Sequence, residues 1–274
     1  SLAFTLAGLD VAAIESDPVA ALYAAANAPE AKVTCADGLA AELPEADAIW
    51  LDPARRAEDG RRISSPERWT PPFSRALSLA RGFPLAGIKV APGIAYHALP
   101  PRAFVEWISE RGQLLEAVVW LGMGTGRAAT VDGERLNSGA KTADEPAVFV
   151  APRPLGPLLF EPDPAIVRSG GIARLCEKHG LAPVSEGIAY LTGEAAPPHC
   201  AAFEVLDVVV PEAKRIKRSL AAHGIGRTEV KKRGTEVDVA AMAKKLSGRG
   251  GDAGVVLFSP VLGRHRAIVA RRRR

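Results

Sequence analysis

In the first half of this chain, short apolar runs alternate with helix-like segments, and three of the runs end in an acidic turn. The runs cover residues 9–15 (LDVAAIE), 32–36 and 46–51 (ADAIWL), and a helix is expected over 18–27. Short continuous apolar runs are typical of buried strands, and their alternation with helices is typical of parallel sheets. The pattern therefore predicts a parallel α/β sheet in the front half.

Local signals predict the other elements of this half. Asp17 is expected to cap the helix over 18–27, because Pro18 follows it in the first turn. The polar, arginine-rich segment 54–70 is expected to be a loop. The remaining elements are expected to be helices over 72–81 and 101–111, a strand over 84–91, and strands over 114–121 and 127–131 that form a hairpin around 122–126.

The composition changes in the second half. The proline-rich stretch 151–164 (APRPLGPLLFEPDP) predicts a linker on the surface. After it, helices are expected over 165–179, 212–223 and 237–246, with strands within 182–191 and over 201–210, 226–233, 254–259 and 265–271. We therefore expect an α/β domain over 1–150, a linker over 151–164 and a smaller α+β domain, ferredoxin-like in its element order, over 165–274.

The three acidic turns are candidates for ligand binding, because ligands of open parallel sheets bind at the carboxyl ends of the strands. Glu15, after the first run, is placed to accept hydrogen bonds from both hydroxyls of a ribose. The turn Asp37-Gly38 can bind an adenine amino group, although an ordinary turn explains that pair equally well. The third turn is Asp52-Pro53, and its place at a strand end favours a function.

The motifs DVAAIESDP, VTCADG and AIWLDPARR, in this order, resemble the second to fourth motifs of class I S-adenosylmethionine-dependent methyltransferases. The whole chain is similar to bacterial members that carry a C-terminal THUMP-like domain and a D-P-A-R-R motif. The resemblance implies a Rossmann-like sheet that binds S-adenosylmethionine. It also implies an N-terminal truncation, because the glycine-rich first motif is expected just before Ser1, and this chain is then expected to bind the cofactor poorly.

The resemblance also assigns roles to residues. It implies that Glu15, Ser16, Asp37 and Gly38 bind the cofactor, and that Asp52, Pro53, Arg55 and Arg56 form the catalytic turn. Related amino-group methyltransferases have an aromatic residue at the position of Arg55, so the two arginines favour contact with a phosphate-bearing substrate. Trp69 is a candidate for stacking on that substrate.

Charge is divided between the two halves. Residues 1–150 contain 14 Lys and Arg against 19 Asp and Glu, a net charge of −5, and residues 151–274 contain 21 against 12, a net charge of +9. The basic clusters fit either RNA bound through its phosphates or a solvated surface, and the resemblance to THUMP-like domains implies RNA as the partner. The candidate contacts are Lys214, Arg215, Lys217, Arg218, Lys231, Lys232 and Arg233.

Other classes of function are disfavoured. Three scattered cysteines without a C-x-x-C pair argue against a disulfide framework or a zinc site and fit a reducing cytoplasm, and no metal is expected. No apolar run reaches the roughly 18 residues of a membrane span, so no membrane partner is expected. Two other functions stay open, a non-catalytic RNA-binding protein with a degenerate Rossmann-like half and a small-molecule O-methyltransferase. The oligomeric state does not follow from the sequence.

Overall fold

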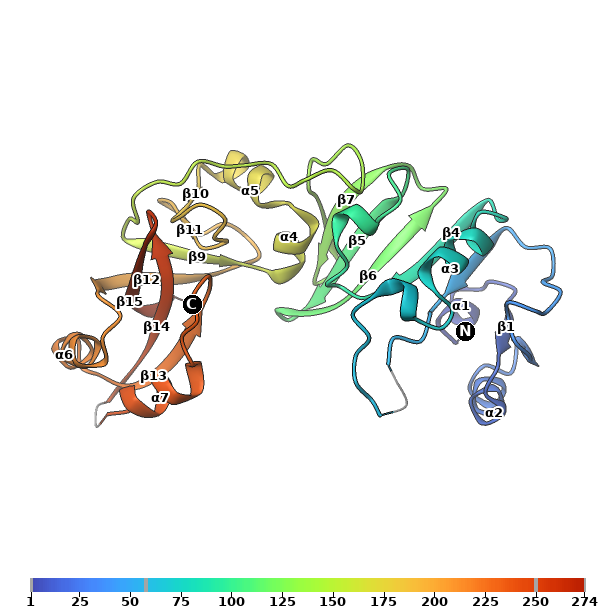
Figure 1. The fold of residues 1–274 in the computed structure, drawn as a ribbon, viewed down its shortest axis with the longest axis horizontal. Coiled ribbons are helices and arrows are strands. Elements are labelled where there is room, and N and C mark those ends of the chain that lie inside the picture. Colours follow the sequence, from blue (N-terminus) through green and yellow to red (C-terminus); the bar gives the residue numbers. More distant parts are fainter. Residues whose placement is uncertain (1, 57–58, 249–250, 274) are drawn as a thin grey trace. The chain divides into compact units, whose positions relative to one another are not determined.

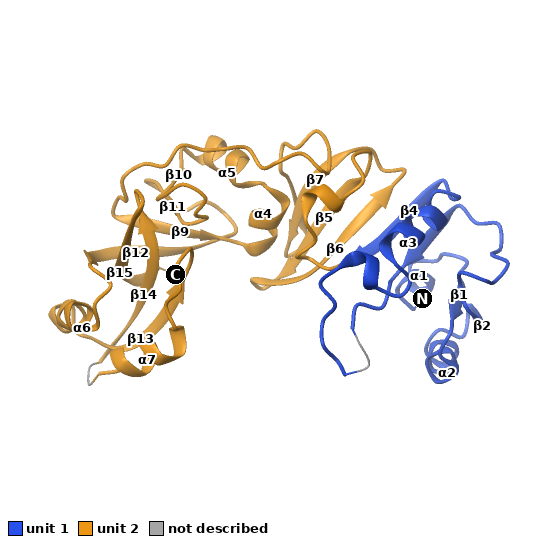
Figure 2. Cartoon of the chain, in the orientation of Figure 1, with its two compact units in different colours: residues 1–89 blue, residues 90–274 orange. Residues whose placement is uncertain are grey.

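The computed structural model describes residues 2–56, 59–248 and 251–273, and the chain divides into two compact units, residues 1–89 and 90–274 (Figure 2). Each strand and helix expected in the first unit is present (Figure 1). Its elements are α1 (Leu2–Leu6), β1 (Ala12–Glu15), α2 (Pro18–Asn27), β2 (Lys32–Cys35), β3 (Ala48–Leu51), the 3-10 helix η1 (Pro66–Arg68), α3 (Phe73–Ala80) and β4 (Leu85–Val90).

The strands of the first unit form two parallel pairs. In one pair β1 lies beside β2, with Glu15 opposite Cys35. In the other β3 lies beside β4, with Leu51 opposite Ile88. The parallel direction confirms the expectation from the sequence. Within the described residues, however, no pairing joins β1 or β2 to β3 or β4, so these strands do not form the one sheet that was expected.

Apolar side chains of α2 are exposed. Val19, Leu22 and Tyr23 are 58%, 68% and 65% exposed, and their spacing places them on one face of the helix. Parallel strands are normally covered on both faces, yet only intermediate and exposed residues occur along β1 and β2. The described residues therefore leave part of this α/β layer uncovered.

The second unit begins with a mixed sheet that differs from the expectation. Its strands lie in the order β6-β5-β7-β8, with β5 antiparallel to β6 and parallel to β7. The helix expected over 101–111 is wrong, because that segment is β5. The hairpin expected around 122–126 is also wrong, because β5 separates the two strands that it would join. The bounds are η2 (Tyr96–Ala98), β5 (Phe104–Glu110), β6 (Gln113–Leu121), β7 (Gly126–Val131) and β8 (Glu134–Asn137).

The position of β5 explains why it is a strand. Val105 and Trp107 are fully buried, and α4 (Pro164–Ser169) packs on β5 and β7. A short apolar run has no periodicity that distinguishes a buried strand from a buried helix. Pro101 favoured a helix in the sequence, because proline is common at the first turn of a helix. In the structure, pairing with β6 and β7 makes this segment a strand instead.

The rest of the second unit contains a seven-stranded sheet in the order β10-β11-β9-β12-β15-β14-β13 (Figure 1). The elements are β9 (Leu158–Pro162), α5 (Ile172–His179), β10 (Ala182–Pro183), β11 (Leu191–Thr192), β12 (Cys200–Val209), α6 (Ala213–Ala222), β13 (Ile225–Lys232), α7 (Val239–Leu246), β14 (Asp252–Val261) and β15 (Arg264–Arg273).

Three expectations for this region are corrected. Part of the expected linker, residues 158–162, is the largely buried strand β9 between β11 and β12. The helix expected over 165–179 is two helices, because Gly170 takes a left-handed φ of +79° and ends α4. From β12 on, the element order is β-α-β-α-β-β, which differs from the β-α-β-β-α-β order of a ferredoxin-like fold. The boundaries at 150 and 164 lie inside the second unit and stay a prediction.

Helices α6 and α7 cover one face of this sheet. Ile216 and Leu220 of α6 and Leu246 of α7 pack with Val256 and Phe258 of β14 in one buried cluster. A second cluster, which includes Leu159 and Phe203, fills another part of the core. In the described part of the chain, no helix has the length and apolar character to cross a membrane.

Candidate functional site

The turns after β1 and β2 lie side by side. Because the two strands are parallel and Glu15 is opposite Cys35, both turns leave the same edge of the pair. The amide of Ala36 donates to the carbonyl of Glu15 at 3.0 Å, and an ideal Cβ on Gly38 would lie 3.8 Å from Ile14 of β1. The structure thus brings together the four residues expected to bind a nucleoside, Glu15, Ser16, Asp37 and Gly38.

The carboxylate of Glu15 is held by its own turn. Its Oε1 accepts hydrogen bonds from the amide of Asp17 at 2.9 Å and from the hydroxyl of Ser16 at 3.4 Å. Both of these bonds reach the same oxygen, so Oε2 is oriented by the turn and available as an acceptor. A fixed carboxylate with an available oxygen can bind a ribose hydroxyl.

Asp17 has the capping role expected for it. Its Oδ1 accepts from the amides of Val19 at 2.7 Å and Ala20 at 3.1 Å, at the first turn of α2. The two acids of this turn therefore do different things. Asp17 caps α2, whereas Oε2 of Glu15 stays available as an acceptor.

Asp37 begins a tight turn after β2. Its Oδ1 accepts from the amide of Leu39 at 2.9 Å, and its carbonyl accepts from the amides of Ala40 and Ala41. One oxygen of the carboxylate, Oδ1, is therefore used to stabilise the turn, as in an ordinary turn. The hydrogen bond also fixes the side chain at the edge beside Glu15, which a purine-binding carboxylate requires.

Asp52 follows β3, and the structure gives it a partner that the sequence did not indicate. Its Oδ2 lies 3.4 Å from Nζ of Lys89 on the neighbouring strand β4, and the Lys89 side chain is only 27% exposed. Pro53 is buried beneath the turn, whereas Asp52 is exposed. The only sequence signal for Lys89 was a single charge in the apolar run PLAGIKVA.

Backbone pairing holds the described residues of the arginine-rich segment after Pro53. The carbonyl of Arg55 accepts from the amide of Ile63 at 2.9 Å, and Nη1 of Arg56 donates to the carbonyl of Gly60 at 3.1 Å. Trp69 is 2% exposed, and its Nε1 donates to the carbonyl of Ile63 at 3.0 Å. The suggestion that Trp69 stacks on a substrate is therefore wrong, because its ring is part of the core.

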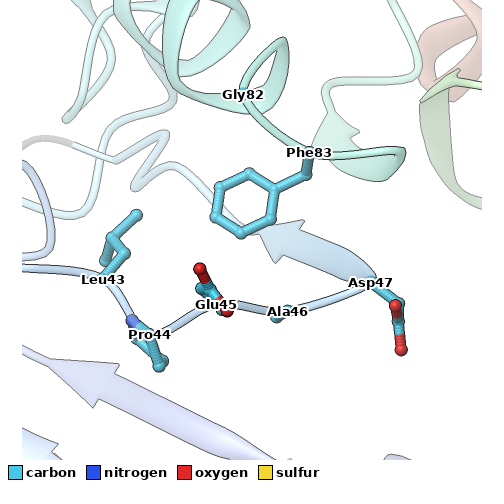
Figure 3. Close-up of a pocket in the computed structure, with 7 residues that line it drawn as sticks. All are labelled: Leu43, Pro44, Glu45, Ala46, Asp47, Gly82 and Phe83. Atoms are coloured by element: carbon cyan, nitrogen blue, oxygen red, sulfur yellow. The ribbon is translucent and has the colours of Figure 1, made fainter.

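A hollow of the first unit lies at the opposite ends of the strands (Figure 3). It is lined by residues 43–47, which precede β3, and by Gly82 and Phe83, which precede β4. Ligands of parallel sheets bind at the carboxyl ends instead. We therefore place the candidate site at the edge with Glu15, Asp37 and Asp52.

The basic residues expected to bind RNA separate into two groups. Lys214, Arg215, Lys217 and Arg218 are exposed on α6. Two of the three basic residues at the end of β13 are instead only about a quarter exposed, and both contact Glu161. Nζ of Lys231 lies 2.7 Å from Oε2 of Glu161, and Nη2 of Arg233 lies 3.5 Å from Oε1.

Alternation along β13 explains this separation. Val230 packs in the cluster beneath α6 and α7, so Lys232, two residues on, points to the helical side. Lys231 points to the other face, where Glu161 lies. Lys244 and Lys245 of α7 are also exposed. They were not among the contacts expected from the sequence, because basic residues are common in the last turn of any helix.

No group of three or more His, Cys, Asp or Glu side chains in the described residues is placed to hold a metal ion. Cys176 and Cys200 lie around one buried cluster of the second unit, where burial raises the pKa of the Cys176 thiol to about 11 and that of Cys200 to about 12.

This chain is similar in sequence to a known domain family and to two known proteins. Residues 200–272 match the family model of THUMP domain-like sequences. Two proteins of Mycobacterium tuberculosis, from strains CDC 1551 and H37Rv and both named uncharacterized S-adenosylmethionine-dependent methyltransferases, are 33% identical to this chain over 229 residues. The match includes 78% of this chain and 62% of each relative, so the chain spans less than two thirds of their length.

A solved structure has the same architecture. The crystal structure of a proposed methyltransferase from Porphyromonas gingivalis W83 superposes with a TM-score of 0.73, at 14% identity, over 96% of this chain and 71% of its own. At this identity the likeness shows the fold alone. The chain therefore has a two-part α/β fold with a THUMP-like second part, as expected from the sequence.

Proposed function

We propose that this chain serves S-adenosylmethionine-dependent methyl transfer to RNA and that it holds part of the cofactor site. The observation that carries the proposal is the edge formed by β1 and β2, where Glu15 and Asp37 are fixed side by side. The names of the two mycobacterial relatives and the THUMP-like match support it.

The residues at this edge fit a nucleoside cofactor. Oε2 of Glu15 would accept from a ribose hydroxyl, with Ser16 holding the carboxylate. The second oxygen of Asp37 would accept from the adenine amino group, and Gly38 leaves the base room to approach. S-adenosylmethionine supplies an activated methyl group on a sulfonium.

The Asp52-Pro53 turn would position the acceptor. Asp52 can accept a hydrogen bond from the acceptor group and hold its lone pair toward the methyl carbon, so the new bond forms as the carbon–sulfur bond breaks. Positioning of this kind can supply most of the rate of an in-line displacement. Lys89 keeps the carboxylate in place, and Arg55 and Arg56 would bind phosphate next to the acceptor.

We further propose that the cofactor site is incomplete in these residues. In the described chain β1 pairs with β2 alone, and Val19, Leu22 and Tyr23 of α2 are uncovered. A further parallel strand beside β1, carrying the glycine-rich turn that the family resemblance implies, would explain both. Such a turn packs its backbone against the methionine half of the cofactor.

RNA would be held by the exposed basic residues over α6 and α7. Together the two helices contain six Lys and Arg, four in α6 and two in α7, and no Asp or Glu. A surface of this kind binds phosphates without reading sequence, and its affinity falls as salt rises. Lys232 adds to this surface, whereas Lys231 and Arg233 are engaged with Glu161.

Two experiments test the proposal. Calorimetric titration of S-adenosylmethionine is expected to show tight binding by a protein extended upstream by about thirty residues, the length of a βαβ unit, and weak binding by this chain. Equal tight binding by both would contradict the incomplete site. In the extended protein, Asp52→Ala is expected to abolish methyl transfer to bulk tRNA and leave cofactor binding intact.

The matched control for Asp52→Ala is Asp10→Ala. Asp10 is an exposed acid before β1 whose carboxylate lies 3.9 Å from Lys32, away from the carboxyl ends of the strands. It is expected to leave methyl transfer unchanged. Full activity of Asp52→Ala would refute the assignment of the methyl-transfer turn.

A second candidate function is a non-catalytic RNA-binding protein. The observation that favours it is the absence of pairing between β1 and β3 within the described residues, which leaves the acidic turns on separate sheets. Failure of the extended protein to bind the cofactor, with RNA binding intact, would support this function over methyl transfer.

A further inference from the structure

Residues 54–56, which follow β3, pair with residues 62, 63 and 70 to form a hairpin. Ala54 and Thr70 exchange two backbone hydrogen bonds, of 2.7 and 3.0 Å. The amide of Ile63 donates to the carbonyl of Arg55, and Arg56 pairs with Arg62 in an isolated antiparallel bridge. Residues 57–58 lie outside the described residues. The two arms are therefore held together at two places, near Ala54 and near Arg56, although the sequence predicted only a loop.

A buried tryptophan fastens this hairpin to the first unit. The indole of Trp69 donates to the carbonyl of Ile63 and packs edge-on against Phe73 of α3, with ring centroids 6.0 Å apart. Glu67 accepts hydrogen bonds from the hydroxyl of Ser74 at 2.6 Å and from its amide at 3.2 Å. These contacts hold the described residues of the hairpin in place without a ligand, which lowers the entropic cost of binding.

The hairpin places like charges opposite one another. Arg56 and Arg62 are directly paired, so their side chains leave the same face of the hairpin, and like charges in this position are destabilising. Both side chains are exposed. Arg56 uses Nη1 for Gly60, and in the described residues neither guanidinium is paired with a carboxylate. An anion between them would remove the repulsion, and a guanidinium fork matches phosphate oxygens.

We propose that this hairpin binds the sugar-phosphate backbone of the acceptor RNA through Arg56 and Arg62. This inference rests on the proposed function for the identity of the polyanion. The hairpin starts directly after Pro53, so a phosphate held there is next to the proposed methyl-transfer turn. Because phosphate contacts fix position and carry no sequence information, the hairpin would set which nucleotide reaches Asp52 without selecting its base.

The test measures binding of a fluorescently labelled single-stranded oligouridylate to the present chain by anisotropy, without cofactor. Arg56→Gln with Arg62→Gln is expected to weaken binding about tenfold and to lower the slope of log K against log salt by about 1.4, the value for two phosphate contacts to a single strand. The control is Arg75→Gln with Arg81→Gln, which removes two exposed arginines of the same unit and is expected to leave both quantities near wild type.

A further variant and a competitor distinguish between the possible explanations of a change in binding. Trp69→Phe keeps an aromatic ring but loses the indole N–H that donates to Ile63, so it is expected to weaken oligouridylate binding several-fold with all arginines present. Inorganic tripolyphosphate that competes as well as the oligonucleotide would reassign the site to a free polyphosphate. Equal affinity of the Arg56/Arg62 variant and its control would overturn the inference while leaving methyl transfer untouched. Conversely, a hairpin effect in a protein that methylates no RNA would overturn only the proposed function.

Discussion

Lys89 and Asp52 form an ion pair between neighbouring parallel strands, with Nζ 3.4 Å from Oδ2. The pair lies at the carboxyl ends of β3 and β4, one residue beyond the matched residues Leu51 and Ile88. It fixes the carboxylate that we place at the methyl-transfer turn. A residue that acts in this way positions a catalytic group and does not contact the substrate.

Lys89→Met is therefore expected to separate activity from stability. An ion pair with this exposure contributes less than about 1 kcal/mol to the free energy of unfolding, whereas misplacement of a catalytic carboxylate can lower kcat by about 100-fold. Methyl transfer by the extended protein and urea denaturation would be compared. Lys32→Met, which removes the exposed pair with Asp10, is the control and should change neither. A kcat within twofold of wild type would contradict the positioning role of Lys89.

Asp17→Ala is expected to destabilise the first unit by about 1 kcal/mol, because it removes the side-chain cap of α2. Asp17→Ser retains an acceptor and should recover most of that loss in urea denaturation. The backbone amide of residue 17 still donates to Glu15 in both variants, so cofactor affinity should not change. A loss of affinity in Asp17→Ser would show that the cap and the ribose site are not separable.

The bounds of α2 show what local signals can determine. The cap and the following proline predicted Pro18–Asn27, and the structure has the same residues, because these signals act within one turn of the helix. The start of β5 shows the opposite case. Pro101 favoured a helix, but two neighbouring strands decide the conformation of Val105 and Trp107, and such pairing is not encoded within the segment itself.

The candidate site divides in the same way. Glu15, Asp37 and Asp52 could be chosen from the sequence, because acids at strand ends mark the ligand edge of a parallel sheet. Lys89 could not, because its role depends on the register of β3 and β4. The stacking role of Trp69 was predicted wrongly, because the pairing of residues 54–70 that buries its ring is set by the fold.

The two faces of β13 give a prediction about RNA. Lys214→Gln with Lys217→Gln is expected to lower the salt slope of RNA binding by about 1.4, with little effect on stability. Lys231→Gln with Arg233→Gln is expected to leave that slope unchanged. It should instead lower the free energy of unfolding by about 1–3 kcal/mol, because Glu161 loses its partners. Anisotropy at several salt concentrations and urea denaturation check both, and a reversed pattern would show that the RNA faces the other side of β13.

The cysteines give a prediction about pH. Burial raises the pKa of Cys176 to about 11 and that of Cys200 to about 12, above the value of about 8.5 in an unfolded chain. The neutral thiols thus favour the folded state fully below about pH 8.5, and this stabilisation is lost as the pH rises toward 11 to 12.

Thiol titration with Ellman's reagent checks this reading. At pH 8 the folded chain should react rapidly through Cys35 alone, which is exposed, and three thiols should react in guanidinium. Cys35→Ser should remove the rapid phase. Two rapid thiols in the folded protein would contradict the low reactivity expected of the buried Cys176 and the half-buried Cys200.

The alternation of side chains along β13 also has a consequence for how such a protein can diverge. Neighbouring positions on this strand, Lys231 and Lys232, belong to different faces, so substitutions one codon apart fall under different selection. Substitutions of Lys232 would change the affinity for a polyanion and leave the ion pairs of Lys231 and Arg233 with Glu161 intact. Among homologues we expect the ion pairs of Lys231 and Arg233 with Glu161 to be conserved and the residue at position 232 to vary with the ligand.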